Sequence, residues 1–323
     1  MKKLKVFVVS IVIISCAMIG CGKKAANTTG AAADYPALVA VPGGTFTQTD
    51  GTSSFSHTIS AFKIGKYPVT YDLWYTVYIW AINNGYTFAD AGTEGSSGKA
   101  GAAPTDEKYQ PVTTVNWHDA IVWCNAYSQK SGLTPVYCAD AGFTFPIKSS
   151  KAGINGISVN PALGSIDNPY VNWNANGYRL PTEGEYQYAA SYINGTNWTP
   201  YNYASGATAD YTNAAATGLV AWYKENSGST QNVGVKKANA LGIYDMSGNV
   251  WEWCWDLYGI YPATASIDYR GPATGAYRVM RGGNCGFSAE HTQVGYRDSD
   301  YLDYPYYTYS RFFGFRVVCS AQK

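Results

Sequence analysis

The sequence predicts an α+β fold with short mixed strands, few helices and many loops. The 323 residues include 34 glycines, and 15% of the residues are aromatic while only 14% are charged. A chain of this composition favours short irregular strands joined by loops around a densely packed aromatic interior. Three helix-capping patterns lie between the strand-like segments and account for the helical part.

The N-terminal segment has the order of a bacterial lipoprotein signal. Three lysines among the first five residues precede the apolar run 6–14, and Gly20 stands directly before Cys21. Such a signal would be removed as residues 1–20 and Cys21 would carry the lipid, while secretion without a lipid is the alternative. Residues 21–34 are small and polar and form a flexible tether. We therefore expect a protein at the outer membrane or cell surface, attached to the membrane only through its lipid anchor.

Charge and cysteine usage exclude several functions. Removing residues 1–20 takes away three of the 23 basic residues and none of the 22 acidic ones, so the formal charge becomes 20 − 22 = −2. Without a basic patch we expect no binding to nucleic acid. Three scattered histidines disfavour a metal enzyme. An odd number of cysteines follows Cys21, so at least one should be free; these are Cys124, Cys138, Cys254, Cys285 and Cys319.

The first half of the domain, which spans residues 35–323, begins with strands. Residues 41–46 predict a strand entered through a turn, and residues 59–67 predict a second strand. Thr70 can cap a helix that ends near Gly85, and residues 86–108 predict a loop. The buried stripe of that helix would consist of Trp74, Val77, Tyr78 and Ala81.

Two capping boxes predict two further helices. Asn116 forms the first capping box with Asp119, and the helix that follows would end at Gly132. Its buried stripe would consist of Ala120, Trp123, Cys124 and Tyr127. Thr182 forms the second capping box with Glu185 and begins a short helix. Further on, three tryptophans alternate in a strand and predict one indole face against the core; they are Trp251, Trp253 and Trp255.

The C-terminal segment is unusually rich in tyrosine and aspartate. Residues 296–309 include six tyrosines and three aspartates, and they contain no Lys, Glu, Gln, Met or Trp. Tyrosine gives a large, stiff contact area, and short polar side chains add adaptable hydrogen bonds, which is the chemistry of a binding surface. A tyrosine-rich strand pair at the edge of a sheet is the alternative interpretation.

Four motifs in a fixed order carry a resemblance to a known family. They are residues 179–186 (RLPTEGEY), 242–253 (GIYDMSGNVWEW), 281–283 (RGG) and 314–318 (GFRVV), and residues 41–46 and 67–70 match the family's N-terminal signatures. Together they resemble the formylglycine-generating-enzyme, or sulfatase-modifying-factor, branch of the C-type lectin fold. The resemblance covers about residues 40–319 and implies that fold.

The resemblance also defines the alternative function, an oxidoreductase acting on protein cysteines. The family's enzymes carry a reactive cysteine pair shortly after the Arg-Gly-Gly segment and bind copper there. This chain has Cys285 after Gly283 and then no cysteine until Cys319, so we expect no enzyme and no required cofactor. Relatives hold a structural calcium ion at positions that match Asp245, Gly248, Val250 and Glu252; oxygen ligands suit calcium, and a capped turn without metal explains the same residues.

The tail resembles the variable region of proteins diversified by retroelements, of the Treponema variable protein type. In this family a mutagenised segment lies between an Arg-Gly-Gly opening and a Gly-Phe-Arg close, which here delimit residues 284–313. The resemblance implies a monomeric surface protein that binds a protein ligand on a host or bacterial surface. Arg297, Pro305 and Arg311 would brace the backbone. The candidate contact residues are Cys285, Gly286, Phe287, His291, Asp298, Asp300, Tyr301, Asp303, Tyr304, Tyr306, Tyr307 and Tyr309.

Overall fold

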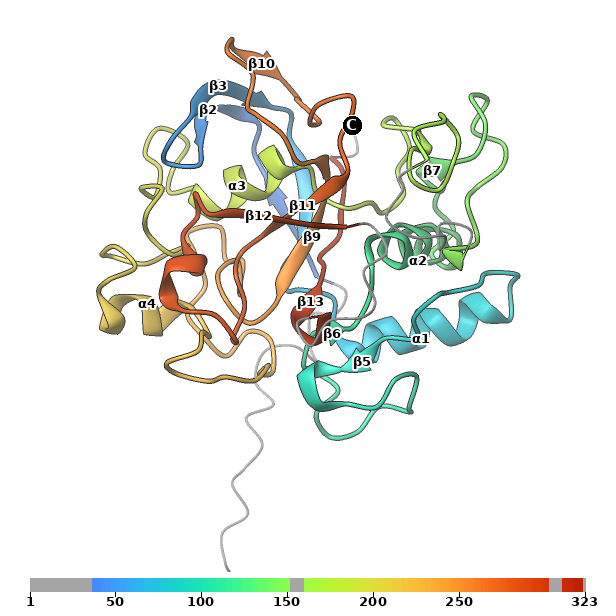
Figure 1. Cartoon of the computed structure of the whole chain (residues 1–323), viewed down its shortest axis with the longest axis horizontal. Helices are drawn as coiled ribbons and strands as arrows, with labels where there is room; N and C mark the ends of the chain where they lie inside the picture. The colour runs from blue at the N-terminus through green and yellow to red at the C-terminus, as the bar shows by residue number, and fades with distance from the viewer. Residues whose placement is uncertain (1–36, 152–159, 302–309, 322–323) are drawn as a thin grey trace, which may run out of the picture.

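A four-stranded sheet lies at the centre of the molecule (Figure 1), with strand order β12-β11-β9-β13. The computed structural model describes residues 37–151, 160–301 and 310–321. The sheet consists of β9 (Trp251–Leu257), β11 (Tyr277–Arg281), β12 (Arg297–Tyr301) and β13 (Phe313–Gly314). β11 is antiparallel to both β9 and β12, whereas β13 is parallel to β9.

Two three-stranded sheets and two short pairs surround this centre. One sheet has the order β1-β4-β14 and comprises Leu38–Val41, Phe62–Gly65 and Val318–Ser320. The other has the order β10-β3-β2 and comprises Ser266–Ile267, Ser54–Ile59 and Gly44–Thr49. The two pairs join β5 (Thr93–Glu94) to β6 (Val112–Thr113) and β7 (Tyr137–Cys138) to β8 (Tyr170–Val171). The strand predicted at 41–46 is thus divided between β1 and β2, and the one predicted at 59–67 is shortened to β4.

Three helices begin where the capping patterns predict. α1 (Tyr71–Ile82) has Thr70 as its N-cap, and full capping boxes precede α2 (Trp117–Lys130) and α3 (Glu183–Ser191). The sequence analysis missed α4 (Ala214–Val220), a short helix of small residues. The α+β class is confirmed. None of the helices in the described ranges is long and apolar enough to cross a membrane.

The core is built from aromatic rings, as the composition predicts. Trp74 of α1 and Trp123 of α2 stack with centroids 5.9 Å apart, and Phe315 meets both edge-on. All three tryptophans of β9 lie in this same cluster, which confirms the predicted indole face. However, the intervening side chains of β9 are buried too, because α3 covers the opposite face of the sheet.

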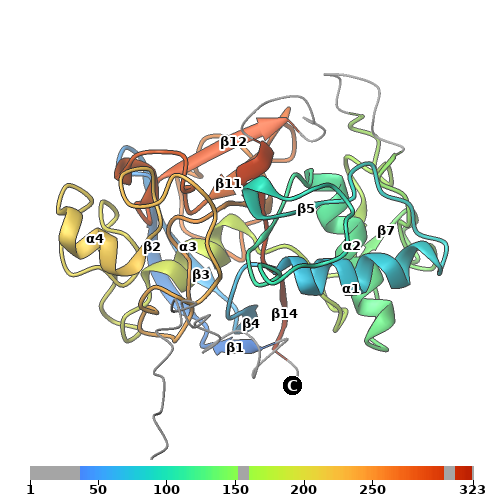
Figure 2. The ribbon, with the colours of Figure 1, turned by 90° about the horizontal axis from the view of Figure 1, so that it is seen from below.

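The edge strand β12 lies at one end of the molecule. In Figure 2, β12 and β11 lie at the top, and the β1-β4-β14 sheet lies at the bottom together with the C-terminal end. The described part of the chain begins just before β1. The candidate binding segment therefore faces away from the end at which the chain enters the domain.

Candidate ligand-binding surface

β12 forms the edge of the central sheet and carries part of the candidate segment. Its register places Arg297 opposite Arg281 and Asp298 opposite Met280 on β11. Because successive side chains of a strand point to opposite faces, Arg297 faces α3 while Asp298 and Asp300 face the other way. The strand thus separates a buried anchoring face from a face that lies at the surface.

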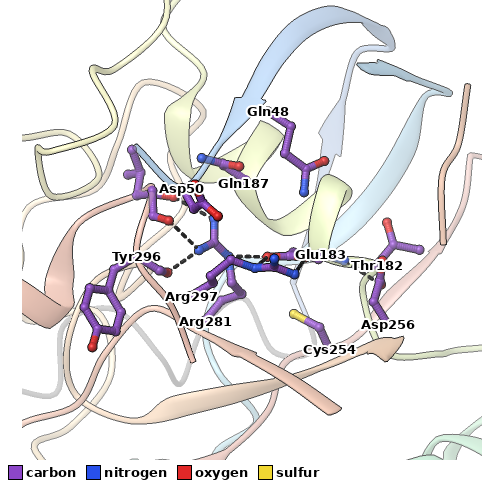
Figure 3. A network of polar contacts seen from close by, with 12 residues as sticks. Gln48, Asp50, Thr182, Glu183, Gln187, Cys254, Asp256, Arg281, Tyr296 and Arg297 are labelled. Carbon is purple, nitrogen blue, oxygen red and sulfur yellow. Dashed lines mark hydrogen bonds and ion pairs between the residues drawn. The ribbon is translucent and has the colours of Figure 1, made fainter. Parts of the chain in front are cut away.

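Arg297 anchors this strand to α3 (Figure 3). Its Nε donates to Glu183 Oε1 at 2.8 Å and its Nη2 to Glu183 Oε2 at 2.7 Å, while Nη1 donates to the carbonyl of Gly259 at 2.7 Å. The guanidinium also lies 4.4 Å from the ring centroid of Tyr258 and 4.2 Å from that of Tyr261. The bracing role predicted for Arg297 is confirmed. Arg311 is exposed and lies over the ring of Phe312, and Pro305 lies outside the described residues.

A second buried arginine holds the loop before β12. Arg281 is 1% exposed, and its Nη2 donates to the carbonyl of Val294 at 2.7 Å. Its Nη1 donates to the carbonyls of Gly295 and Tyr296. Gly283 permits this close packing, since its φ is +75° and a Cβ would stand 2.4 Å from the carbonyl oxygen of His291. Glycine is required there because both the conformation and the space exclude a side chain.

A third buried arginine joins two of the family motifs. Arg316 Nε donates to Glu252 Oε2 at 2.7 Å and Arg316 Nη2 donates to Glu252 Oε1 at 2.8 Å. Both side chains are fully buried. Burial without a partner would be costly for either charge, so the pair holds together residues that are 64 positions apart in sequence.

The four positions considered for calcium make several contacts within the protein. Both oxygens of Glu252 accept from Arg316, and Oε1 also lies 3.3 Å from the hydroxyl of Tyr186. The carbonyl of Gly248 accepts from the amide of Val250 at 2.9 Å. Asp245 Oδ2 accepts from the amide of Gly234, whereas its Oδ1 has no hydrogen-bond partner, and burial raises the pKa of Asp245 to about 6. These contacts fit the capped-turn interpretation.

Several predicted contact residues gather in a half-buried aromatic cluster. The rings of Phe287 and His291 have centroids 4.9 Å apart, and those of His291 and Tyr296 are 4.7 Å apart. Tyr296 in turn packs on Trp251 at 6.0 Å. Each ring of the cluster except Trp251 is partly exposed. Fixed core aromatics thus support ring faces that a ligand can reach.

Asp298 lies beside this cluster, and Asp300 lies farther along β12 on the same face of the strand. Asp298 is half-buried, and burial raises the pKa of its carboxyl group. Asp300 is partly exposed, as is Gly286 in the loop that carries the cluster. The structure therefore brings four of the predicted contact positions to one partly exposed region, with Asp300 farther along β12; the four are Gly286, Phe287, His291 and Asp298.

Cys285 is a wrong prediction. It is completely buried, its amide donates to the carbonyl of Asn249 at 3.1 Å, and burial raises the pKa of its thiol to about 12. Its side chain packs inside the loop because Gly282 and Gly283 turn the backbone inward directly before it. No signal in the sequence separates it from its exposed neighbours.

The remaining predicted contacts are only partly described. Tyr301 ends β12 and pairs with Tyr277 on β11. Asp303, Tyr304, Tyr306, Tyr307 and Tyr309 lie outside the described residues. Sequence reasoning missed Tyr296, although it belongs to the tyrosine-rich segment, and Tyr277, which is 37% exposed and lies outside that segment.

None of the five cysteines in the described part of the chain has a thiol activated by its surroundings. All five that follow the N-terminal region are free and buried, which confirms that an unpaired cysteine is present. Burial raises the pKa of every one of these thiols above its ordinary value. A thiol is nucleophilic as the thiolate, so these side chains are in unreactive surroundings. Among the described residues, no group of three or more His, Cys, Asp or Glu side chains could hold a metal ion.

Comparisons with known proteins identify the family. The model of the sulfatase-modifying factor enzyme 1-like domain matches residues 23–321. The chain is 32% identical to the chaperone protein LppX of Paenibacillus barcinonensis over 294 residues, covering 85% of this chain and 88% of that protein. It is 36% identical to the formylglycine-generating enzyme of Streptomyces coelicolor over 129 residues, covering 36% of this chain and 38% of the enzyme.

A solved structure extends the comparison to the variable proteins. Treponema denticola variable protein 1 is 31% identical and superposes with a TM-score of 0.66, covering 88% of this chain and 95% of that chain. This match confirms both the resemblance to a retroelement variable protein and the C-type lectin-like fold of the formylglycine-generating-enzyme branch. The chain belongs to the family of sulfatase-modifying factor enzyme 1-like domains.

Proposed function

We propose that this protein binds a macromolecular ligand, namely another protein, through the surface formed by β12 and the loops on either side of it. One observation carries the proposal. Partly exposed aromatic and acidic side chains lie on a backbone that is held in place by the buried hydrogen bonds of Arg281, Arg297 and Arg316. Because the backbone is held from inside, the outward side chains can differ without moving it. The likeness to Treponema denticola variable protein 1 supports this use of the fold.

The chemistry of the surface favours a partner with basic character. Asp298 borders the aromatic cluster, and opposite charges across an interface speed association and select partners. Phe287 and Tyr296 offer ring area of the kind that dominates many protein interfaces. A single shallow patch binds weakly, yet many copies anchored on one cell would add avidity without new contacts.

We also propose that the protein is displayed on a membrane surface through a lipid on Cys21. The position of β12 at the end opposite β1 supports this arrangement (Figure 2), because a tether before β1 would leave the binding surface facing outward. Labelling cells with a fatty-acid analogue tests it. The wild type and a Cys16→Ser control should be labelled, and a Cys21→Ser variant should not. Equal labelling of the Cys21→Ser variant would contradict lipidation.

We infer that the chain does not catalyse cysteine oxidation. Some relatives are named as enzymes, including the formylglycine-generating enzyme of Streptomyces coelicolor. The support for a non-enzymatic role is the burial and raised pKa of all five described thiols. The thiolate needed for copper binding and for redox chemistry is disfavoured in such surroundings.

Selection from a displayed library of peptides and proteins tests the binding proposal. Recovered ligands are measured against the wild type and against a variant with alanine at Phe287 and His291. We expect affinity to fall at least tenfold, because a few central aromatic residues usually dominate an interface. Phe145→Ala is the matched control, since Phe145 is 68% exposed and lies outside the proposed surface. Ligands that bind the double variant and the wild type equally would place the site elsewhere.

A further inference from the structure

A cavity of about 340 Å³ lies outside the proposed binding surface. Its walls are aromatic, aliphatic and cationic, and they include Leu163, Pro169, Trp173, Trp255, Arg270 and Arg278. A second cavity of about 300 Å³ adjoins it, and the two share Trp173 and Arg270. The size of the first cavity falls at the lower end of the range for small-molecule sites.

Aromatic rings and guanidinium groups alternate along the cavity. The guanidinium of Arg278 lies 4.8 Å from the ring centroid of Trp255. Trp255 meets Trp173 edge-on at 5.7 Å, and the guanidinium of Arg270 lies 3.8 Å from Trp173. The two tryptophans thus form a wall with a cation at each end.

The inner cation has no carboxylate bound to it. Arg278 is 2% exposed, and its two terminal nitrogens donate to the backbone carbonyls of Trp255 and Asp167. Its Nε has no hydrogen-bond partner. Burial lowers the pKa of Arg278 to about 9, which shows that its surroundings compensate the charge incompletely.

The carboxyl groups near Arg278 are engaged elsewhere. Asp167 accepts from His118 Nε2 and from the amide of Asn160, each at 2.7 Å. Asp256 accepts from the amide of Glu183, and burial raises the pKa of Asp256 to about 8, so it is largely neutral at pH 7. Neither group neutralises Arg278 by direct contact.

The outer cation is accessible, and no residue in the described ranges is bonded to it. Arg270 is exposed, and among the described residues it makes neither an ion pair nor a hydrogen bond. Arg179, on the same tryptophan, differs because its guanidinium holds both oxygens of Glu185 at 2.7 and 2.6 Å. The carboxylate of Asp268 accepts from the amide and the hydroxyl of Ser60.

We propose that this cavity binds a small carboxylate with an aromatic or other apolar body. The carboxylate would bind the guanidinium of Arg270, which presents a planar fork suited to a two-oxygen acceptor. The apolar body would lie against Trp173 and Trp255, and the enclosed charge of Arg278 would favour the anion from within. One accessible guanidinium suits a singly charged carboxylate better than a phosphate dianion, which requires more donors.

Binding of indole-3-acetate, followed by isothermal titration, tests the proposal on the domain from residue 35. We expect saturable binding to the wild type, at least tenfold weaker binding of the neutral amide, and at least tenfold weaker binding to an Arg270→Gln variant. Lys99→Gln, which removes an exposed charge outside the cavity, should bind like the wild type. Thermal unfolding verifies that both variants are folded, and Arg270→Lys should recover part of the affinity.

A second probe separates the two sources of such a carboxylate. Acetyl-alanyl-tryptophan represents a peptide C-terminus. Tighter binding of this probe than of indole-3-acetate would assign the site to peptide ends, and tighter binding of indole-3-acetate would assign it to free acids. Equal affinity for acid and amide, undiminished binding to the Arg270→Gln variant, or absence of saturable binding at millimolar concentrations would overturn the proposal. Displacement of the acid by inorganic phosphate at lower concentration would also overturn it, because the site would then select phosphate.

Discussion

The guanidinium of Arg297 holds both carboxylate oxygens of Glu183, at 2.8 and 2.7 Å, and so ties the edge strand of the central sheet to the first turn of α3. Arg297 belongs to the segment whose composition resembles a diversified region, yet its side chain points inward. Its neighbour Asp298 points the other way. A strand can therefore present different side chains on one face while the other face keeps the same anchor.

Replacing Arg297 by alanine should destabilise the domain by about 3 kcal/mol or more, because Glu183 would remain buried without its partner. Arg311→Ala is the matched control, since Arg311 is an exposed arginine of the same segment, and we expect a change below about 0.5 kcal/mol. Urea unfolding measures both. Similar losses in the two variants would mean that the ion pair does not anchor the strand.

Four tyrosines of the tyrosine-rich segment should be replaceable without loss of the fold. A variant with serine at Tyr301, Tyr304, Tyr306 and Tyr307 should unfold cooperatively with a midpoint near that of the wild type, because the sequence predicts that these tyrosines contact a ligand and not the core. As a comparison, Trp253→Ala should cost about 3–5 kcal/mol, because Trp253 is buried in the core. A broad transition, or a fall as large as that of Trp253→Ala, would show that these tyrosines belong to the core.

Asp256 should make the domain less stable as the pH rises from 4 to 8. Its folded-state pKa is about 8, against 3.8 in its ordinary state, owing to burial and the nearby negative charge of Glu183. The folded protein holds a proton that the unfolded chain releases, so this contribution is complete below pH 3.8 and is lost as the pH approaches 8. Asp256→Asn, which keeps the shape and an acceptor oxygen, should flatten this slope, by at most about 1.4 kcal/mol per pH unit.

The comparison of Asp256→Asn with the wild type isolates this one carboxyl group. His57 contributes with the opposite sign between pH 4 and 6.5, because burial lowers its pKa to about 4. That contribution is present in both proteins and cancels in the difference. Denaturant unfolding at several pH values gives the two curves. Parallel curves would show that the pKa of Asp256 is not raised by folding.

The thiols of the native domain should be inert. In a protein that begins at residue 35, a thiol reagent at pH 8 should react with none of the cysteines before unfolding and with about five of them afterwards, because all five are buried with raised pKa values. Incubation with copper and a sulfatase-motif peptide should not oxidise the peptide beyond a protein-free control. Rapid labelling of Cys285 in the folded state, or oxidation of the peptide, would favour the enzyme interpretation.

Local signals predicted the starts of α1, α2 and α3 correctly because capping is a local interaction. The side chain of Thr182 accepts a hydrogen bond from the amide of Glu185, only three residues away. Both residues of the cap therefore lie within one short stretch of sequence, where the pattern can be recognised. Alternation in β9 predicted the indole face for a similar reason. It failed to predict the buried opposite face, because that burial depends on α3, about 60 residues earlier in the chain.

The sequence by itself determined the family, the starts of α1, α2 and α3, the tryptophan face of β9 and the boundaries of the tyrosine-rich segment. Only the tertiary structure decided that Glu252 pairs with Arg316, that Cys285 turns inward, and that Arg270 and Arg278 flank a cavity. The physical reason is distance along the chain. Caps and alternation are fixed by residues within a few positions, whereas the burial and partners of a side chain depend on segments that meet only when the whole domain has folded.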